Sequence, residues 1–156
     1  MLNLKYYWLF FVLLFISFGC DSSKVFEEYK KMDKFSWYRF NNLEFDVLIE
    51  DTESEYDVFI LFRHLPEFPH HQLPINLTIY SPSGEVRSAN HLLDLYDDEG
   101  NRLSECMGDF CDVSVLVRKE ITFYETGTFR FMIENKWKKV DLPGIMEVGL
   151  MIRKSR

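Results

Sequence analysis

The sequence predicts an all-β domain, an antiparallel β-sandwich of the jelly-roll kind, behind a cleaved signal peptide. Three observations support this prediction. The 156 residues include 15 Phe, 8 Tyr and 3 Trp but a single alanine, and aromatic residues favour pleated strands. Apolar and polar residues alternate in short segments that glycine and proline punctuate, which is typical of hairpin strands. A basic residue and a short apolar run open the chain, as in exported proteins.

The N-terminus has the layout of a signal peptide. Lys5 precedes an apolar run of 13 residues, 6–18. This run is too short to cross a bilayer core as a helix, which needs about 20 residues. A run of this length behind a positive charge is typical of the hydrophobic region of a signal peptide. We therefore expect residues 1–19 to be removed on export.

A cysteine, Cys20, follows this run directly after Gly19. A small residue before a cysteine at this place resembles the lipobox of bacterial lipoproteins, although Ser17 stands where that signal usually has leucine. The resemblance implies that Cys20 carries acyl chains such as palmitate and becomes the first residue of a membrane-anchored protein. Each buried CH₂ contributes about 0.8 kcal/mol, so two or three chains anchor stably. The alternatives are an ordinary signal peptide or an anchor helix with an incidental cysteine.

Cleavage leaves 137 residues, which is one domain's worth. We expect a short tether at residues 20–24 and one β-sandwich domain at residues 25–156. Losing Lys5, the single charged residue of the signal, takes the net charge from −7 to −8. The chain has no basic stripe with interleaved aromatics, so we expect no nucleic-acid partner. An acidic domain also gains nothing from charge at an anionic lipid surface, which leaves anchoring to the acyl chains.

The strands of this domain follow from the apolar pattern. Residues 25–40 fit either one face of a helix or extended chain, and their aromatic residues favour a strand or a loop. Residues 43–49 place apolar side chains at alternate positions, and residues 56–62 are apolar nearly throughout, as in a strand buried on both faces. Turns are expected at Ser81-Pro82-Ser83-Gly84 and at residues 97–101. The remaining strands are expected at residues 75–80, 113–117, 121–123, 127–135 and 145–152.

Cys106 and Cys111 remain once Cys20 is assigned to lipid. An even pair in an oxidising compartment favours a disulfide, which the loop-entropy model values at roughly 2 kcal/mol for so short a loop. A metal site or free thiols are the alternatives. Zinc would need two further ligands, and no histidine lies near in sequence.

Motifs of catalysis are missing from the sequence. It has no G-x-S-x-G, no H-E-x-x-H and no P-loop. His64, His70 and His71 would hold a metal only if their loop folded back, and adjacent loop histidines are usually solvated. Asp97-Asp98-Glu99-Gly100 fails the calcium-loop pattern because Leu95 stands at its first ligand position. We expect a non-enzymatic protein without metal or cofactor.

A second class of function stays open, a glycan-binding or small-ligand-binding lipoprotein of the same fold. Trp37, Trp137 and the tyrosines would then form a stacking platform for a sugar. In a chain with 17% aromatic residues, core packing is the simpler explanation of these side chains.

Several motifs occur in the order known from one protein family. Phe62-Arg63 ends a strand, an aromatic-proline loop follows at residues 68–73, and Pro82 with Gly84 marks the next turn. Gly127-Thr128-Phe129 and residues 142–150, which read Leu-x-Gly-Ile-x-x-Val-Gly-Leu, close the domain. With Trp37 near the start, residues 29–152 resemble the GldH family of gliding-motility lipoproteins of the Bacteroidetes.

The resemblance implies a non-enzymatic envelope component that works through protein–protein contacts in the gliding and type IX secretion apparatus. Gly108-Asp109 matches the family, whereas Ser104 and Cys106 stand where it has small glycines. A disulfide would restore the tight geometry there. Surface loops carry binding residues more often than cores do. The candidate surface is therefore the loop at residues 69–74 with Arg63, together with the loop at residues 107–109. The candidate partner-binding residues are Arg63, Pro69, His70, His71, Gly108 and Asp109, with a structural role for Arg63 as the alternative.

The membrane face follows from the tether. Surface-exposed lipoproteins of this phylum tend to carry an acidic run just after the cysteine, and here Asp21 is followed by Ser22-Ser23-Lys24. We therefore expect a domain that faces the periplasm from the outer membrane.

Overall fold

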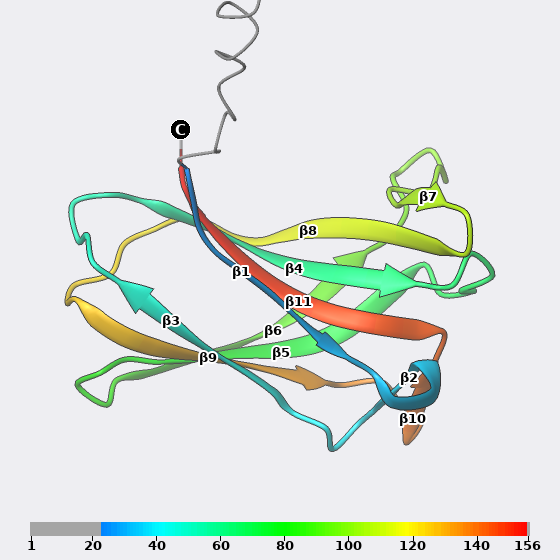
Figure 1. Ribbon diagram of the computed structural model, residues 1–156, viewed down its shortest axis with the longest axis horizontal. Coiled ribbons are helices and arrows are strands. Elements are labelled where there is room, and N and C mark those ends of the chain that lie inside the picture. Colours follow the sequence, from blue (N-terminus) through cyan, green and yellow to red (C-terminus); the bar gives the residue numbers. More distant parts are fainter. Residues whose placement is uncertain (1–22, 156) are drawn as a thin grey trace, which may run out of the picture.

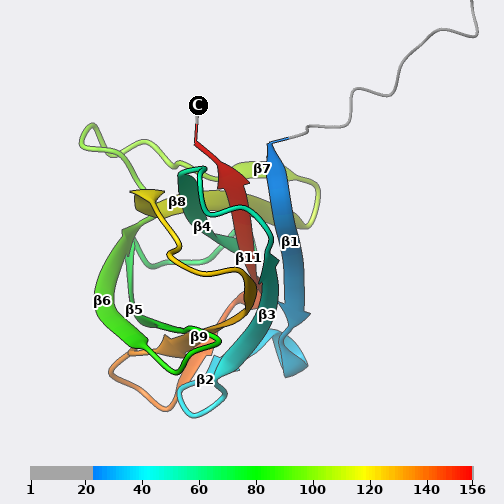
Figure 2. The same ribbon diagram turned by 90° about the vertical axis from the view of Figure 1, so that its left-hand side faces the viewer.

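The computed structural model describes residues 23–155, which form a sandwich of two antiparallel β-sheets (Figures 1 and 2). The predicted signal peptide and Cys20 lie outside these residues. No helix among residues 23–155 is long and apolar enough to cross a membrane. Apart from one short 3₁₀ helix, η2 (Asp33–Phe35), the elements are strands: β1 (Lys24–Lys31), β2 (Ser36–Tyr38), β3 (Leu43–Ile49), β4 (Tyr56–His64), β5 (Gln72–Tyr80), β6 (Val86–Asp94), β7 (Glu105–Met107), β8 (Phe110–Ile121), β9 (Gly127–Asn135), β10 (Asp141–Pro143) and β11 (Ile145–Lys154).

The strand order is that of a jelly roll. One sheet has the order β1-β11-β4-β8-β7 and the other β3-β9-β5-β6, while β2 and β10 pair separately. If β2, β7 and β10 are left aside, eight strands remain. Numbered along the chain, they are ordered 1-8-3-6 in one sheet and 2-7-4-5 in the other. Two interlocked Greek keys of this kind make a jelly roll, and the predicted fold class is confirmed.

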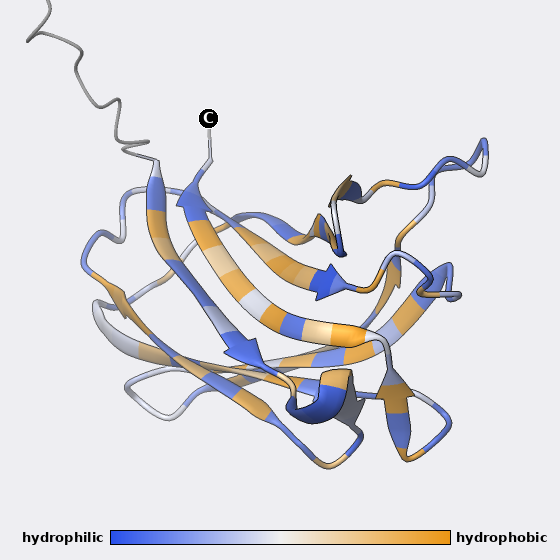
Figure 3. Cartoon of the chain, turned by 45° about the vertical axis from the view of Figure 1, so that its right-hand side comes forward, coloured by the Kyte–Doolittle hydropathy of each residue, from blue (hydrophilic) through white to orange (hydrophobic). Residues whose placement is uncertain are grey.

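The core lies between the two sheets, where alternate side chains of each strand meet. In β3 the buried and exposed positions alternate without exception, and Figure 3 shows the same alternation of hydropathy along the strands. Phe123 packs edge-on against Tyr56 and Phe129, with ring centroids 5.3 and 4.7 Å apart. Such contacts add to the stabilisation from burial itself. The core contains eight of the 19 aromatic residues in the described part of the chain.

Residues 25–40 are mostly extended, in β1 and β2, with the short η2 helix between them. This agrees with the prediction of a strand or a loop. Two expectations were wrong. Residues 113–117 and 121–123 are not separate strands, because β8 runs unbroken through the polar stretch between them and ends before Phe123. Strand β5 begins at Gln72, because the Gln72 side chain bonds Asp94 across the sheet at 2.6 Å. The predicted loop at residues 69–74 is therefore shorter than expected.

The two ends of the sandwich differ in what they carry. At one, which we call the proximal end, β1 begins beside the end of β11 and the start of β4: Lys154 N–H bonds Ser23 O at 2.8 Å and Ser155 N–H bonds Glu55 O at 2.8 Å. At the other, the distal end, β4 finishes and β5 begins. Strand β4 has nine residues, so the two ends are about 30 Å apart at about 3.3 Å per residue.

Candidate partner-binding surface

Most of the loop residues predicted to bind a partner are exposed at the distal end. Pro69, His71, Gly108 and Asp109 are exposed there, and His70 is half-buried. Pro69, His70 and His71 come from the β4–β5 loop, residues 65–71, and the other two from the turn between β7 and β8. Figure 1 shows β7 and the β2–β10 pair at this same end, on the right-hand side.

A single arginine, Arg102, links the two predicted loops. Its Nη1 donates a hydrogen bond to Pro66 O in the β4–β5 loop at 2.9 Å. The same nitrogen lies 3.7 and 3.8 Å from the sulfur atoms of Cys106 and Cys111. Its guanidinium also lies 5.8 Å from the ring centroid of Tyr96. Sequence reasoning missed Arg102, because nothing in its local pattern distinguishes it from a solvated charge.

Cys106 and Cys111 are joined by a disulfide in the structure. They stand opposite each other in the β7–β8 hairpin, with their Cα atoms 3.9 Å apart. Gly108 in the intervening turn has a φ of +62°, in the left-handed region that glycine adopts at least cost. Met107 beside it is 71% exposed. The hairpin therefore presents an apolar side chain on a covalently closed turn.

The three histidines of this region each contact a different partner. His70 lies against Trp137, with ring centroids 4.3 Å apart, and His71 stacks on Tyr96 at 4.0 Å. His64 is buried, its Nδ1 is 2.8 Å from Leu65 O, and burial lowers its pKa. Within residues 23–155 no group of three or more His, Cys, Asp or Glu side chains is placed to hold a metal ion. The histidines thus position the loops against aromatic rings.

Arg63 is held by strands on both sides. It donates two hydrogen bonds to the Asp112 carboxylate, at 2.8 and 3.0 Å, and one to Glu147 at 3.3 Å. Hydrogen bonding to Asp112 raises the pKa of Arg63. Its guanidinium also lies 4.3 Å from the ring centroid of Phe110. Because Asp112 and Glu147 belong to the strands that flank β4, Arg63 holds three strands in register, and this favours its structural role.

Exposed apolar side chains are concentrated on the distal loops. Among residues 23–155, twelve large hydrophobic side chains are exposed, and six of these stand on the distal loops or beside them. Phe40 is the most exposed, at 82%. Of the six, sequence reasoning included Met107 alone, in the candidate loop at residues 107–109. Most of the others lie near β2 and β10, which it did not predict. We call all six the distal apolar set: Phe35, Tyr38, Phe40, Leu103, Met107 and Val140.

The backbone of Gly144 holds the β4–β5 loop in place. Gly144 has a φ of +92°, and a Cβ built there would lie 2.9 Å from the Phe68 ring. Its N–H bonds Phe35 O at 2.8 Å, and its carbonyl accepts the N–H of Leu65 at 2.9 Å. This glycine therefore joins the two parts of the distal end, the β4–β5 loop and the η2–β2 segment.

The tryptophans do not form a shared stacking platform. Trp37 is fully buried and donates its indole N–H to Asn41 O at 2.9 Å. Trp137 is half-buried against His70. A sugar platform built on Trp37 is therefore wrong, because that ring has no exposed face.

The chain is similar to two gliding-motility proteins. A relative from Christiangramia forsetii, "Gliding motility lipoprotein GldH homolog", is 27% identical over 154 residues, with 94% of this chain and 93% of that protein covered. "Gliding motility lipoprotein GldH" of Flavobacterium johnsoniae is 22% identical over 142 residues, covering 86% and 87%. Among solved structures, the CspB protease of Clostridium perfringens overlaps 83% of this chain but 25% of its own length. Its TM-score is 0.39 and its identity 13%.

A protein-family model decides the classification. The model described as GldH lipoprotein matches residues 24–152, which run from the first residue of β1 to within two residues of the end of β11. The match thus spans both sheets of the sandwich and every loop of the distal end. This chain belongs to the GldH lipoprotein family.

Proposed function

We propose that this protein is a lipid-anchored, non-enzymatic component of the gliding and type IX secretion apparatus that acts through protein–protein contacts. Cys20 carries the lipid, and the distal end makes the contacts. The observation that supports this most directly is the placement of the distal apolar set on loops about 30 Å from the proximal end. Exposed apolar side chains gathered at one end of a domain are consistent with an interaction surface there.

The anchor and the contact surface are then separated by the length of the sandwich. Cys20 precedes the first residue of β1, Lys24, by four residues, which span at most about 14 Å. Acyl chains on Cys20 would thus hold the proximal end close to the bilayer, and the distal end would face away from it. In the orientation that we propose, the distal end projects into the periplasm from the outer membrane.

The distal loops are also suited to bind without large rearrangement. Arg102 and the disulfide connect the β7–β8 turn to the β4–β5 loop, and Gly144 connects that loop to the η2–β2 segment. Rigid loops lose less conformational entropy on association. The contact surface would therefore comprise Pro69, His70, His71, Gly108 and Asp109 together with the distal apolar set, while Arg63 supports it.

A pull-down from detergent-solubilised envelopes tests this function. The bait is tagged full-length protein, as wild type and with Phe40→Ser plus Met107→Ser. Leu48→Ser is the matched control, because Leu48 is exposed at 56% on β3, outside the distal loops. We expect gliding or secretion components to be captured by the wild type and the control, and at least tenfold less by the double variant. Equal capture by all three would contradict the assignment of the surface.

The orientation needs a separate measurement. Protease treatment of intact cells should leave the domain in place if it faces the periplasm, and release of the domain would contradict the proposed orientation. The same treatment of spheroplasts with a permeabilised outer membrane serves as the positive control, since the domain is then accessible.

A further inference from the structure

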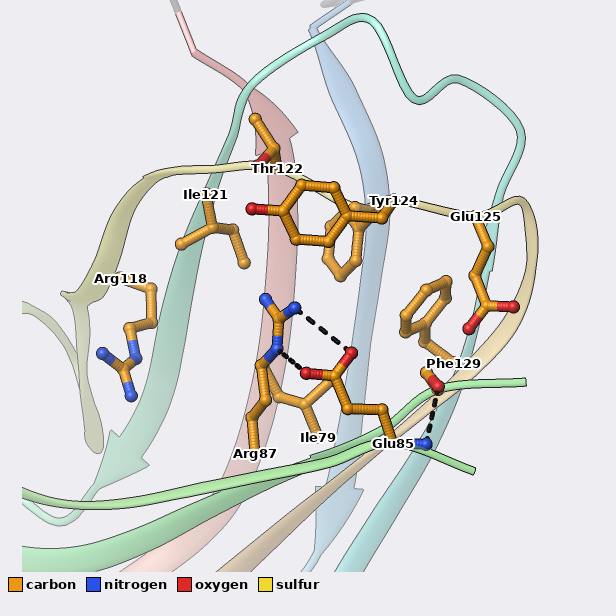
Figure 4. Close-up of a pocket in the computed structure, with 11 residues that line it drawn as sticks. Ile79, Glu85, Arg87, Arg118, Ile121, Thr122, Tyr124, Glu125 and Phe129 are labelled. Carbon is orange, nitrogen blue, oxygen red and sulfur yellow. Dashed lines mark hydrogen bonds and ion pairs between the residues drawn. The ribbon is translucent and has the colours of Figure 1, made fainter. Parts of the chain in front are cut away.

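A pocket opens between β6 and β8 at the proximal end, away from the surface described above (Figure 4). Its volume is about 170 Å³. The apolar part of its lining comes from both sheets and from the segment that follows β8: Ile79, Ile121, Phe123 and Phe129. Ile79, Phe123 and Phe129 are buried, so the interior of the pocket is continuous with the hydrophobic core. An engineered cavity of about 150 Å³ with a similar lining, in an unrelated protein, accepts a benzene molecule.

The pocket exists because the sandwich is not closed along this side. Strand β6 ends its sheet, and on the side away from β4 the strand β8 is paired only at its first residues, with β7. Beyond that point β8 carries two irregularities opposite β4, next to Val58. Bulges of this kind redirect side chains. Here they bring Arg118 opposite the inward-facing Val58, and Arg118 lines the pocket.

The mouth of the pocket carries two arginines, Arg87 and Arg118, and two glutamates, Glu85 and Glu125. Glu125 accepts hydrogen bonds from the N–H and the hydroxyl of Ser83, at 3.2 and 2.6 Å. Arg87 is hydrogen-bonded to Glu85, at 2.9 and 3.3 Å, and lies 5.3 Å from the ring centroid of Tyr124. Arg118 makes no ion pair and no side-chain hydrogen bond with any residue from 23 to 155. In a protein with a net charge of −7, an arginine left without a carboxylate beside an apolar cavity is complementary to an anionic ligand.

The location of the pocket suggests where such a ligand comes from. Ile121 pairs with Tyr56, which in turn pairs with Lys154, so the pocket stands at the same end as the start of β1. Tyr124 at the mouth is 79% exposed. If Cys20 anchors the protein as proposed, this end lies next to the bilayer, where amphiphiles with a charged head and an apolar tail are concentrated. This part of the argument rests on the proposed function.

We propose that the pocket binds a small amphipathic carboxylate, whose apolar tail enters the cavity and whose carboxylate contacts Arg118 and Arg87. A short alkyl chain or a single aromatic ring fits the volume of about 170 Å³. A fatty acid from the membrane is the ligand that the position favours. A free aromatic acid has the same chemistry and is the other source to test.

The test is a titration of full-length protein in lipid nanodiscs, followed through the methyl resonances of Ile79 and Ile121. The probes are octanoate and 3-phenylpropionate, with 1-octanol and inorganic phosphate as controls for tail and charge. We expect saturable shifts for a carboxylate with an apolar tail, and at least tenfold weaker binding of both controls. The proposal would be overturned if neither carboxylate caused shifts, or if 1-octanol bound as tightly as octanoate.

Two variants on neighbouring residues separate the role of Arg118 from general charge. Arg118→Gln should weaken carboxylate binding at least tenfold. Lys119→Gln should leave it unchanged, because Lys119 is exposed and contacts Glu120 outside the pocket. Equal effects of the two substitutions would overturn the proposed contact. Melting temperatures of both variants are measured alongside, to show that each is folded.

A chain-length series then distinguishes the two sources. Affinity that rises from butanoate to octanoate and exceeds that of 3-phenylpropionate would support a fatty acid. Stronger binding of 3-phenylpropionate than of every alkyl carboxylate would overturn the membrane source. Failure of the ligand proposal can be told apart from failure of the proposed function. Arg118 lies at the opposite end of the sandwich from the distal apolar set, and partner capture is measured independently of ligand binding.

Discussion

Arg63 was predicted at the end of a strand, beside a loop, and its role in the structure is to hold the sheet together. Its guanidinium is shared between Asp112, Glu147 and the ring of Phe110. The partners belong to two other strands, β8 and β11, and the sheet brings them to Arg63. The sequence pattern placed Arg63 correctly at the end of β4, but could not show that two carboxylates flank it.

Replacing Arg63 by alanine should destabilise the domain by about 1–3 kcal/mol, because hydrogen bonds to charged groups are lost and two carboxylates are left facing each other. The measurement is the urea midpoint at pH 7. Arg130→Ala is the control: Arg130 also pairs with two acidic residues, Asp46 and Glu44, but all three side chains are more than half exposed. Exposed pairs contribute little, so a change as large for Arg130 as for Arg63 would contradict this account.

Buried histidines should make the protein less stable in mild acid. Burial lowers the pKa of His64, His70 and His91 below the ordinary value of 6.5. The unfolded chain therefore binds protons more readily, and the free energy of unfolding falls as the pH drops below about 6.5. Each such histidine removes up to about 1.4 kcal/mol per pH unit.

Urea unfolding at pH 7.5, 6.5 and 5.5 measures this effect. Stability should decrease slightly between the first two values and more steeply between the second and the third. The His64→Gln variant should show a weaker decrease between pH 6.5 and 5.5. Asp57 adds little in this range, because its pKa is lowered from 3.8 and its contribution is lost only at lower pH. Stability that is unchanged down to pH 5.5 would contradict the assignment.

At the scale of elements, the β4–β5 loop depends on Gly144, the glycine between β10 and β11. Gly144→Ala would place a Cβ 2.9 Å from the Phe68 ring and force a left-handed backbone on alanine. Gly100→Ala meets the same backbone restriction, with a φ of +82°, but nothing lies within 4 Å of its Cβ.

Both alanine variants should therefore lower stability, Gly100→Ala by about 1 kcal/mol and Gly144→Ala by clearly more. The difference between their thermal midpoints isolates the cost of displacing Phe68. Identical midpoints would show that Phe68 moves freely and does not hold the loop. Partner capture by the Gly144→Ala variant should also fall, since the loop is part of the proposed surface.

The strands that sequence reasoning found are those with a clear apolar pattern. Strand β3 alternates fully, and β4 is apolar almost throughout. Strand β6 was missed because eight of its nine residues are exposed or only partly buried, as expected of a strand at the edge of its sheet. Strand β8 was divided in two because the alternating apolar pattern stops at three charged residues, Arg118, Lys119 and Glu120. In the structure the strand continues through them, with bulges opposite β4.

The candidate surface was also predicted only in part. Loop position was enough to indicate His70, His71, Gly108 and Asp109. Arg102 and Phe40 were not indicated, because their roles depend on which loops meet in space. A sequence pattern of period two reports the two faces of a strand, and it carries no information on contacts between loops at the end of a sandwich.

At the scale of the whole molecule, the fold separates three tasks. The core between the sheets holds the largest buried side chains, the proximal end carries the start of β1 and the Arg118 pocket, and the distal end carries the distal apolar set. Both ends of the described chain lie at the proximal end, as Figures 1 and 2 show. A jelly roll with this arrangement leaves its far loops free of chain termini, which suits a protein that binds a partner away from its anchor.

The central claim, that the distal end contacts a partner, is tested most directly by photocrosslinking in intact cells. A photoreactive amino acid is introduced at Phe40, at Met107 and, as the control, at Leu48, which is exposed outside the distal loops. We predict that the first two positions crosslink to the same gliding or secretion component and that Leu48 does not. Crosslinks to that component from Leu48 alone, or none from Phe40 and Met107, would contradict the account.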